Sequence, residues 1–333
     1  MTALVDAHDV VLFDLDGVVY LGPQPVPGAA EGIARLRQRG VRLGFVTNNA
    51  ARRPEDVAAH LQELGIECAA GDVTTSGQAG ARLLAERLPA GAAVLVLGTD
   101  ALRSEVLARG LTEVDSADDA PAGVIQGYDP QLRWPRLNEA AHAVQRGAVW
   151  VATNTDSNRP TERGLVPGHG TAVAAVRAAV TVDPLVAGKP ATPLLLEAVQ
   201  RTGGQRPVFV GDRLDTDVAG ARAAGLASVL VLSGSHGKAD LLAAVPGQRP
   251  DHVARDLRGL LEPALTSTST DAGAVAEGVE VRLVDGALSV DDGLDPRQQL
   301  AAVWAASRLS WAAADEGRTL DATAVLAATP DVP

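Results

Sequence analysis

The sequence contains one cysteine, Cys68, and only 3% aromatic residues. With a single thiol, no intrachain disulfide and no paired-cysteine metal motif can form, so we expect Cys68 to be buried and unreactive. The apolar fraction of 46% comes mainly from alanine, valine and leucine. This composition favours alternating helices and parallel strands over an aromatic-rich β-sandwich.

Positive charge is also scarce, because 29 basic residues face 41 acidic ones and the net charge is −12. Nucleic acid and anionic membrane surfaces would repel such a protein, so we expect neither as a partner. No apolar run approaches the ~20 residues that span a bilayer, and the first residues lack the pattern of a signal peptide. We therefore expect a cytoplasmic protein, with a homodimer as an alternative to a monomer.

Lysine is the rarest source of positive charge, since Lys189 and Lys238 are the only two lysines. In a chain dominated by arginine, a retained lysine indicates a use for a compact ammonium group. We assign that use to Lys189. Lys238, in the loop 235–238, is expected to be solvated.

Strand and helix signals alternate along most of the chain. A first stretch predicts strands at 10–13 and 41–46 and helices at 28–39 and 54–64. An alternation over 74–183 follows, with strands at 94–97, 124–126 and 149–152 and helices at 79–88, 136–146 and 171–180. The first pattern then resumes with a helix opened by Lys189, in which Pro190 takes the first helical position. Strands at 208–210 and 229–232 and a last element at 252–261 complete it.

This pattern predicts an α/β fold: a Rossmann-like parallel sheet with helices on both faces, formed by residues 1–73 and 184–264. An α/β cap is inserted at 74–183, and a small α/β appendage occupies 272–333. Residues 266–271 are expected to be a linker. In the appendage, a hairpin turns at Asp285-Gly286, and a helix from Pro296 carries Leu300, Trp304, Ser307 and Trp311 on one face.

Polar residues cluster directly after the predicted core strands, where open parallel sheets bind ligands. Five carboxylates in such a small volume would repel one another, and a hard divalent cation relieves that repulsion. Magnesium fits best, because it needs few carboxylates and accepts oxygen from a phosphorylated substrate. The residues concerned are Asp14, Asp16, Thr47, Asn48, Lys189, Asp212, Asp215 and Asp217.

Some of these residues also have a simpler interpretation. Asp14 and Asp16 taken singly could be turn carboxylates, and Lys189 could be a surface lysine. Gly188-Lys189 could suggest a nucleotide phosphate loop, but that motif requires glycine at position 183, which is Asp183.

Four ordered motifs resemble those of the haloacid dehalogenase superfamily over roughly residues 8 to 262. They are Asp14-Leu15-Asp16-Gly17, Thr47-Asn48-Asn49, Gly188-Lys189-Pro190, and the segment from Gly211 to Asp217. No single motif is decisive, but all four in this order are highly specific. The resemblance implies a magnesium-dependent phosphatase.

The resemblance also implies a role for each motif residue. Asp14 would be the nucleophile that forms an aspartyl-phosphate, and Asp16 would protonate the leaving oxygen and later activate water. Asp14, Asp212 and the backbone carbonyl of Asp16 would bind Mg²⁺, with Asp217 supporting the site and Asp215 either supporting it or serving the loop alone. The phosphoryl oxygens would be held by Thr47, Asn48, Asn49 and Lys189.

The spacing of the motifs locates the insertion. Asp14 and Thr47 are 47 − 14 = 33 positions apart, whereas Thr47 and Lys189 are 189 − 47 = 142 positions apart, enough for a domain. This arrangement resembles the class II type A phosphatases, in which the cap contacts the leaving group. That resemblance assigns substrate specificity to Asn154, Asp156 and Arg159, although Arg159 could be an exposed turn residue. His169, between two glycines, is expected in a loop.

The C-terminal segment resembles a fragment of an acetyltransferase fold that is attached to actinobacterial glycerol-3-phosphate phosphatases. It has Arg297-Gln298-Gln299-Leu300 where an acetyl-CoA loop would need glycines, so we do not expect acetyl transfer. The substrate is expected to be a small phosphorylated metabolite, with glycerol 3-phosphate as the leading candidate. Phosphoglycolate, pyridoxal phosphate, sugar phosphates and nucleotide monophosphates are alternatives, as is a non-catalytic regulatory protein that binds magnesium and phosphate.

Overall fold

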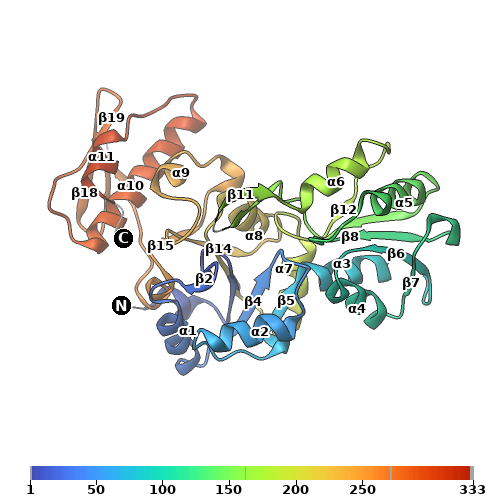
Figure 1. The fold of residues 1–333 in the computed structure, drawn as a ribbon. Coiled ribbons are helices and arrows are strands. Elements are labelled where there is room, and N and C mark those ends of the chain that lie inside the picture. The colour runs from blue at the N-terminus through green and yellow to red at the C-terminus, as the bar shows by residue number, and fades with distance from the viewer. Residues whose placement is uncertain (1, 162, 271, 331–333) are drawn as a thin grey trace. The chain divides into compact units, whose positions relative to one another are not determined.

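The computed structural model describes residues 2–161, 163–270 and 272–330. The chain forms two compact units (Figure 1). The first unit comprises Met1–Leu21, Pro25–Arg42 and Gln205–Pro333, and the second comprises Gly22–Gln24 and Leu43–Gly204. These units divide the chain at different positions from the three-part division expected from the sequence.

Four parallel strands of the first unit lie side by side, in the order β15 (His252–Ala254), β14 (Ala227–Val231), β13 (Pro207–Gly211) and β1 (Val10–Asp14). Every residue of β1 is buried, as expected for a strand covered on both faces. Phe13 pairs with Val210, so β1 and β13 end side by side. The helices of this part are α1 (Ala29–Gln38), α8 (Ala219–Ala223) and α9 (Lys238–Leu242).

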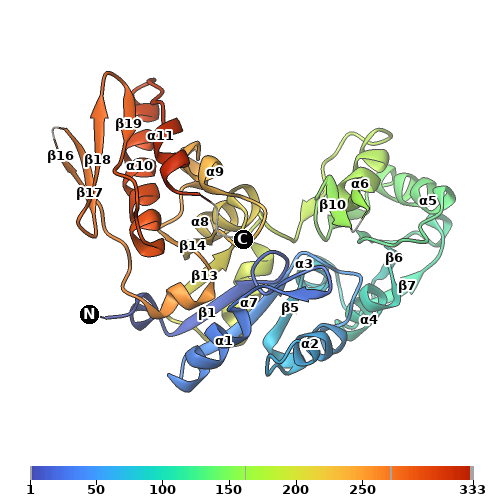
Figure 2. The ribbon, with the colours of Figure 1, turned by 60° about the vertical axis from the view of Figure 1, so that its left-hand side comes forward.

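The C-terminal part of the first unit is an antiparallel sheet with two helices. The strands are β16 (Thr268–Thr270), β17 (Gly273–Ala276), β18 (Val279–Val284) and β19 (Ala287–Ser289). Figure 2 shows α10 (Pro296–Asp315) and α11 (Thr323–Ala328) beside this sheet. The helix face predicted from the sequence is buried, and its Leu300, Trp304 and Trp311 share one hydrophobic core with Leu214 and Leu230.

The second unit contains a five-stranded parallel sheet in the order β12 (Leu185–Val186), β9 (Val149–Ala152), β8 (Gly123–Gln126), β6 (Ala93–Leu97) and β7 (Thr112–Val114). Helices α5 (Trp134–Gln145) and α6 (His169–Arg177) pack on one face. Helices α3 (Ser76–Ala85) and α4 (Asp100–Ala108) pack on the other.

The same unit carries a second strand pair, in which β4 (Arg42–Thr47) and β5 (Val73–Thr75) run parallel. Its remaining helices are α2 (Pro54–Glu63) and α7 (Pro193–Thr202), and strands β10 (Asn158–Thr161) and β11 (Gly164–Pro167) form a hairpin. The short strands β2 (Tyr20–Leu21) and β3 (Gln24–Pro25) lie between β1 and α1 in the sequence.

Several sequence predictions of local structure are wrong. The helix expected to open at Lys189 begins at Pro193, and the Lys189-Pro190 peptide bond is cis. Residues 268–270, expected to be linker, form β16, because β17 offers them an antiparallel partner; Asp271, at the end of that expected linker, lies outside the described residues. Helix α6 begins at His169, two residues earlier than predicted, so His169 is helical rather than part of a loop.

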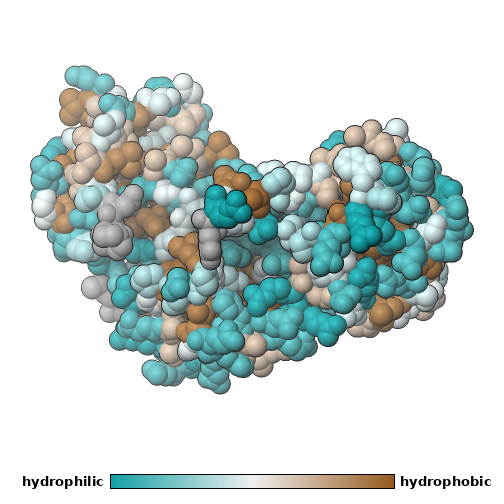
Figure 3. Space-filling view, in the orientation of Figure 1, coloured by the Kyte–Doolittle hydropathy of each residue, from teal (hydrophilic) through white to brown (hydrophobic). Residues whose placement is uncertain are grey.

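Other predictions of local structure hold. Cys68 is buried, as expected, and the strands predicted at 10–13, 94–97, 149–152 and 208–210 match β1, β6, β9 and β13 to within one residue at either end. On the face drawn in Figure 3, hydrophobic residues lie scattered among hydrophilic ones. Among the described residues, no helix is both long enough and apolar enough to cross a membrane.

Candidate active site

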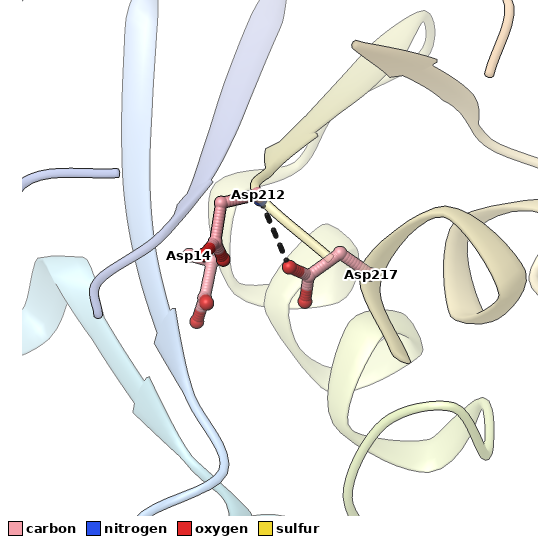
Figure 4. A group of neighbouring side chains, drawn as sticks. All are labelled: Asp14, Asp212 and Asp217. Carbon is pink, nitrogen blue, oxygen red and sulfur yellow. Dashed lines mark hydrogen bonds between the residues drawn. The ribbon is translucent and has the colours of Figure 1, made fainter. Parts of the chain in front are cut away.

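Three buried carboxylates of the first unit lie together at the ends of β1 and β13. Oxygen atoms of Asp14, Asp212 and Asp217 all lie within 4.8 Å of one another (Figure 4). Their side chains are 8%, 0% and 1% exposed, respectively. Because β1 and β13 are adjacent and in register, Asp14 and Asp212 are brought together by the sheet itself.

Asp217 stabilises the backbone at Asp212 through hydrogen bonds. One of its carboxylate oxygens accepts hydrogen bonds from the backbone N–H groups of Asp212, at 3.1 Å, and Arg213, at 3.0 Å. A short π-helical turn at Leu214–Val218 brings Asp217 back toward the strand end. A Cβ at Gly211 would lie 2.2 Å from that of Asp217, so this close return requires glycine.

A loop after β14 also holds the cluster. The N–H of Ser235 donates to Oδ2 of Asp212 at 2.6 Å, and the hydroxyl of Ser233 donates to the carbonyl of Gly17 at 2.9 Å. Nδ1 of His236 accepts a hydrogen bond from the N–H of Leu214 at 2.8 Å. Sequence reasoning missed the contacts of this loop with the site. Its position at the carboxyl end of a core strand was the available signal.

Asp16 and Asp215 differ from the three clustered acids. The Asp16 side chain is exposed, beside the tight turn in which Gly17 has a φ of +84°. The Asp215 carboxylate forms an ion pair with Arg213 at 2.7 Å. Partial burial raises the pKa of Asp215, but its hydrogen bonds to Arg213 outweigh burial and hold the pKa below its ordinary value. Asp215 is thus already neutralised by an arginine.

The chemistry of the cluster suits a hard divalent cation. It offers only carboxylate oxygens, which Mg²⁺ prefers, and no nitrogen or sulfur donor. Three carboxylates so close together and so little exposed to water would repel one another strongly, and a cation offsets that repulsion. The residues present therefore fit magnesium.

In the second unit, Asn48 joins two of the sequence motifs. Oδ1 of Asn48 accepts a hydrogen bond from the N–H of Lys189 at 2.8 Å, and its Nδ2 donates to the Lys189 carbonyl at 3.1 Å. A Cβ at Gly188 would lie 2.7 Å from the same Oδ1, so glycine is needed for this approach. The side chain of Lys189 is buried, and so is that of Thr47.

The loop after β9 lies against the same asparagine. Nδ2 of Asn154 donates to the Asn48 carbonyl at 2.8 Å, and Nδ2 of Asn48 lies 3.3 Å from the Asp156 carboxylate. Oδ1 of Asn154 accepts from the Asp156 N–H at 3.1 Å. Arg159 is exposed, with its guanidinium 4.9 Å from the centre of the Tyr128 ring.

The predicted site residues therefore form two groups. The structure brings together Asp14, Asp212 and Asp217 in the first unit, with Asp16 and Asp215 nearby in sequence. In the second unit it brings together Asn48, Asn154, Asp156 and Lys189, with Thr47 and Asn49 flanking Asn48. Sequence reasoning missed the structural use of the Asn48 side chain.

Two protein families match separate parts of the chain. Residues 11–112 match the family described as haloacid dehalogenase-like hydrolase, and residues 186–260 match a family described as HAD-hydrolase-like. Among curated proteins, the chain is 44% identical over 319 residues to D-glycerol 3-phosphate phosphatase of Mycobacterium tuberculosis. That match covers 92% of this chain and 88% of the relative.

Other similar proteins are also phosphatases. An acid sugar phosphatase of Staphylococcus saprophyticus is 36% identical over 63% of this chain and 81% of its own. Among solved structures, glycerol phosphate phosphatase of M. tuberculosis in complex with magnesium superposes with a TM-score of 0.85 at 43% identity, covering 94% of this chain and 93% of its own. A p-nitrophenyl phosphatase of Archaeoglobus fulgidus has a TM-score of 0.71 at 29% identity, covering 76% and 98%.

Proposed function

The chain belongs to the haloacid dehalogenase-like hydrolases, and from this membership we propose that it is a magnesium-dependent phosphatase that hydrolyses glycerol 3-phosphate to glycerol and phosphate. The buried cluster of Asp14, Asp212 and Asp217 carries the proposal. A buried carboxylate trio at the carboxyl end of a parallel sheet suits metal-assisted phosphoryl transfer.

The choice of glycerol 3-phosphate is supported by the extent of the similarity. The match to the mycobacterial relative covers 92% of this chain, so it must extend into the C-terminal segment. The match to the acid sugar phosphatase covers 63% of this chain. A sugar phosphate is therefore the second candidate substrate.

In this proposal, an oxygen of Asp14 attacks the phosphorus and the bond from phosphorus to the glycerol oxygen breaks. Asp16 gives its proton to that oxygen, so glycerol leaves neutral and an aspartyl-phosphate is formed. Asp16 then takes a proton from water, which attacks the aspartyl-phosphate and releases phosphate. The exposed position of Asp16 is compatible with proton exchange with solvent.

We assign magnesium to Asp14, Asp212 and the backbone carbonyl of Asp16. When bound, the ion supplies positive charge that offsets the negative charge of the carboxylates and of the phosphoryl group. Asp217 keeps Asp212 in place through the hydrogen bonds that it accepts from two backbone N–H groups. The ion pair of Asp215 with Arg213 favours a role in the loop alone.

In this proposal the phosphoryl oxygens are bound by Thr47, Lys189 and the backbone of Asn48 and Asn49. The side chain of Asn48 supports this role, because it fixes the Lys189 backbone on both sides. We further propose that residues 74–183 form a class II type A cap and that Asn154, Asp156 and Arg159 contact the leaving group.

We also propose a cytoplasmic location and a C-terminal acetyltransferase-like fragment, residues 272–333, without acetyl transfer. The catalytic core would then be formed by residues 1–73 and 184–264. A small phosphorylated metabolite is the proposed partner, and a homodimer is the assembly to test by light scattering.

Replacing the proposed nucleophile tests the function directly. Asp14→Asn is expected to lower magnesium-dependent phosphate release from glycerol 3-phosphate by about 10³-fold or more, because the amide cannot form the aspartyl-phosphate. Malachite green detection of phosphate measures this rate.

The matched control is Asp291→Asn, an exposed aspartate that pairs with Arg282 at 2.6 Å in the C-terminal part of the chain. It should keep the wild-type rate. Unchanged turnover in Asp14→Asn would point to a protein that binds magnesium and phosphate without using this site for catalysis.

A further inference from the structure

Among the described residues, three buried polar side chains of the second unit have hydrogen-bonding groups without partners: Gln126, Thr153 and His169. Gln126, the last residue of β8, is fully buried; its Oε1 accepts a hydrogen bond from Nε1 of Trp150 at 2.7 Å, while its Nε2 has no partner. His169, the first residue of α6, is 4% exposed, and neither ring nitrogen has a partner. Such groups are costly to bury unless something satisfies them.

Gln126 and His169 belong to the same side of the sheet. Val173 and Val176 of α6 pack in one core with Val124 and Trp150, which places α6 on the face that carries the Gln126 side chain. The Gln126 carbonyl lies near the His169 ring but does not form a hydrogen bond with it. Both side chains therefore lie on the α6 side of this sheet, at its carboxyl edge.

The protonation state of His169 gives its ring hydrogen-bonding groups that complement those of the Gln126 amide. Burial lowers the pKa of His169 to about 4, so the ring is neutral near pH 7 and has one donor and one acceptor nitrogen. The Gln126 amide adds donors. A water molecule bonded to both side chains would satisfy the groups that have no partner among the described residues.

The backbone on either side of His169 is hydrogen-bonded to the loop after β9. The N–H of Gly168 donates to the carbonyl of Ser157 at 2.9 Å. The N–H of Gly170 donates to the carbonyl of Asp156 at 2.8 Å. A Cβ at Gly170 would lie 2.3 Å from the carbonyl oxygen of Thr155. A shift of His169 must therefore move the segment that contains Asp156.

We propose that Gln126 and His169 enclose an ordered water molecule, and that His169 is thereby a positioning residue for the loop bearing Asn154 and Asp156. The inference rests on the proposed function, in which this loop contacts the glycerol moiety. His169 is buried and does not touch substrate. It acts by fixing the loop that does, so its loss weakens selection of the leaving group and spares phosphoryl transfer.

A comparison of two substrates tests this role. Glycerol 3-phosphate has hydroxyl groups for the loop to recognise, whereas p-nitrophenyl phosphate has none. His169→Leu is expected to raise the KM for glycerol 3-phosphate about 10-fold, the value of roughly one hydrogen bond, with kcat nearly unchanged. The kcat/KM for p-nitrophenyl phosphate should stay within about twofold of wild type.

Conservative variants separate positioning from packing. His169→Asn and His169→Gln retain a donor and an acceptor, so at least one should recover most of the affinity for glycerol 3-phosphate. Gln126→Met, which removes the amide at similar volume, should reproduce the selective rise in KM and supplies the test should His169→Leu fail to fold. The control is His252→Leu, at a histidine in the first unit whose Nδ1 also lacks a partner. It should leave the ratio between the substrates unchanged.

The outcomes are distinct. Equal losses on both substrates, or an unchanged ratio in every His169 and Gln126 variant, would overturn the positioning role while leaving the proposed phosphatase intact. If the wild-type enzyme does not cleave glycerol 3-phosphate, the proposed function fails on that result, and the inference fails with it.

Discussion

At the scale of single residues, two glycines control the position of the Asp212 carboxylate. A Cβ on Gly17 would lie 2.2 Å from Oδ2 of Asp212, and a Cβ on Gly234 would lie 2.1 Å from the same atom. Contacts this short are not tolerated, so a methyl group at either position must displace the carboxylate. The glycines act on the proposed metal site without contributing a ligand.

Gly234→Ala is therefore expected to weaken magnesium binding about 10-fold or more, since a displaced ligand loses favourable coordination geometry. Gly237→Ala, in the same loop, is the matched control, because a Cβ there meets nothing within 4 Å. The magnesium dependence of phosphate release measures the effect. Equal magnesium requirements in the two variants would show that Asp212 tolerates displacement or does not bind the ion.

The clustered acids could be predicted from the sequence, but their supports could not. Asp14 and Asp212 follow buried strands, and the rule for parallel sheets was enough to bring them together. The Asn48 side chain binds the backbone of Lys189, 141 positions later in the sequence, and no local pattern encodes such a contact. The prediction that Lys238 is solvated is wrong for the same reason, because its ammonium donates to the carbonyls of Thr329 and Pro330.

At the scale of elements, Lys238 links α9 to the end of α11. The two acceptor carbonyls lie at the C-terminus of α11, where a cation also interacts favourably with the helix dipole. Lys238→Met is expected to destabilise α11 by about 1–3 kcal/mol, because the carbonyls lose a charged donor. Faster amide exchange confined to residues 323–330 would show this.

An uncharged polar replacement provides the comparison for this link. Lys238→Gln can still donate one hydrogen bond, so its amide exchange should fall between wild type and Lys238→Met. Identical exchange in all three proteins would mean that α11 is held by its apolar contacts alone, among them the buried Val325.

The helix after Lys189 shows why element boundaries are harder to predict than elements. Pro190 and Pro193 both fit the first position of a helix, and local propensity does not distinguish them. Asn48 holds the backbone of Lys189 through both its N–H and its carbonyl, and the helix begins only at Pro193. Similarly, β16 exists because β17 pairs with it, whereas its own serine and threonine residues suggested a linker.

At the scale of the whole molecule, the C-terminal segment shares a core with the sheet that carries Asp14 and Asp212. Trp311 lies in that core, edge-on to Trp304 with 5.7 Å between ring centres, and its Nε1 donates to the Leu241 carbonyl at 2.8 Å. The segment is thus an integral part of the first unit. It is not an independent module on a tether.

Trp311→Ala is accordingly expected to cost about 3–5 kcal/mol of stability in the whole first unit, through lost burial and the cavity left behind. Denaturant unfolding can be followed by circular dichroism, with phosphatase activity measured in parallel. The circular dichroism signal and the activity should be lost at the same denaturant concentration, which is lower than for the wild type. Trp134→Ala is the control, since Trp134 is 71% exposed. Activity that survives to the wild-type midpoint in Trp311→Ala would show that the segment unfolds by itself.

The scarcity of aromatic residues has a practical consequence for spectroscopy. The four tryptophans divide evenly, with Trp134 and Trp150 in the second unit and Trp304 and Trp311 in the first. Replacing either pair by phenylalanine leaves tryptophan in one unit alone. Within the second unit, iodide should quench the exposed Trp134 and spare the buried Trp150, whose emission then reports on the hydrogen bond to Gln126. The tryptophan emission of this protein can therefore be assigned to one unit at a time without an added dye.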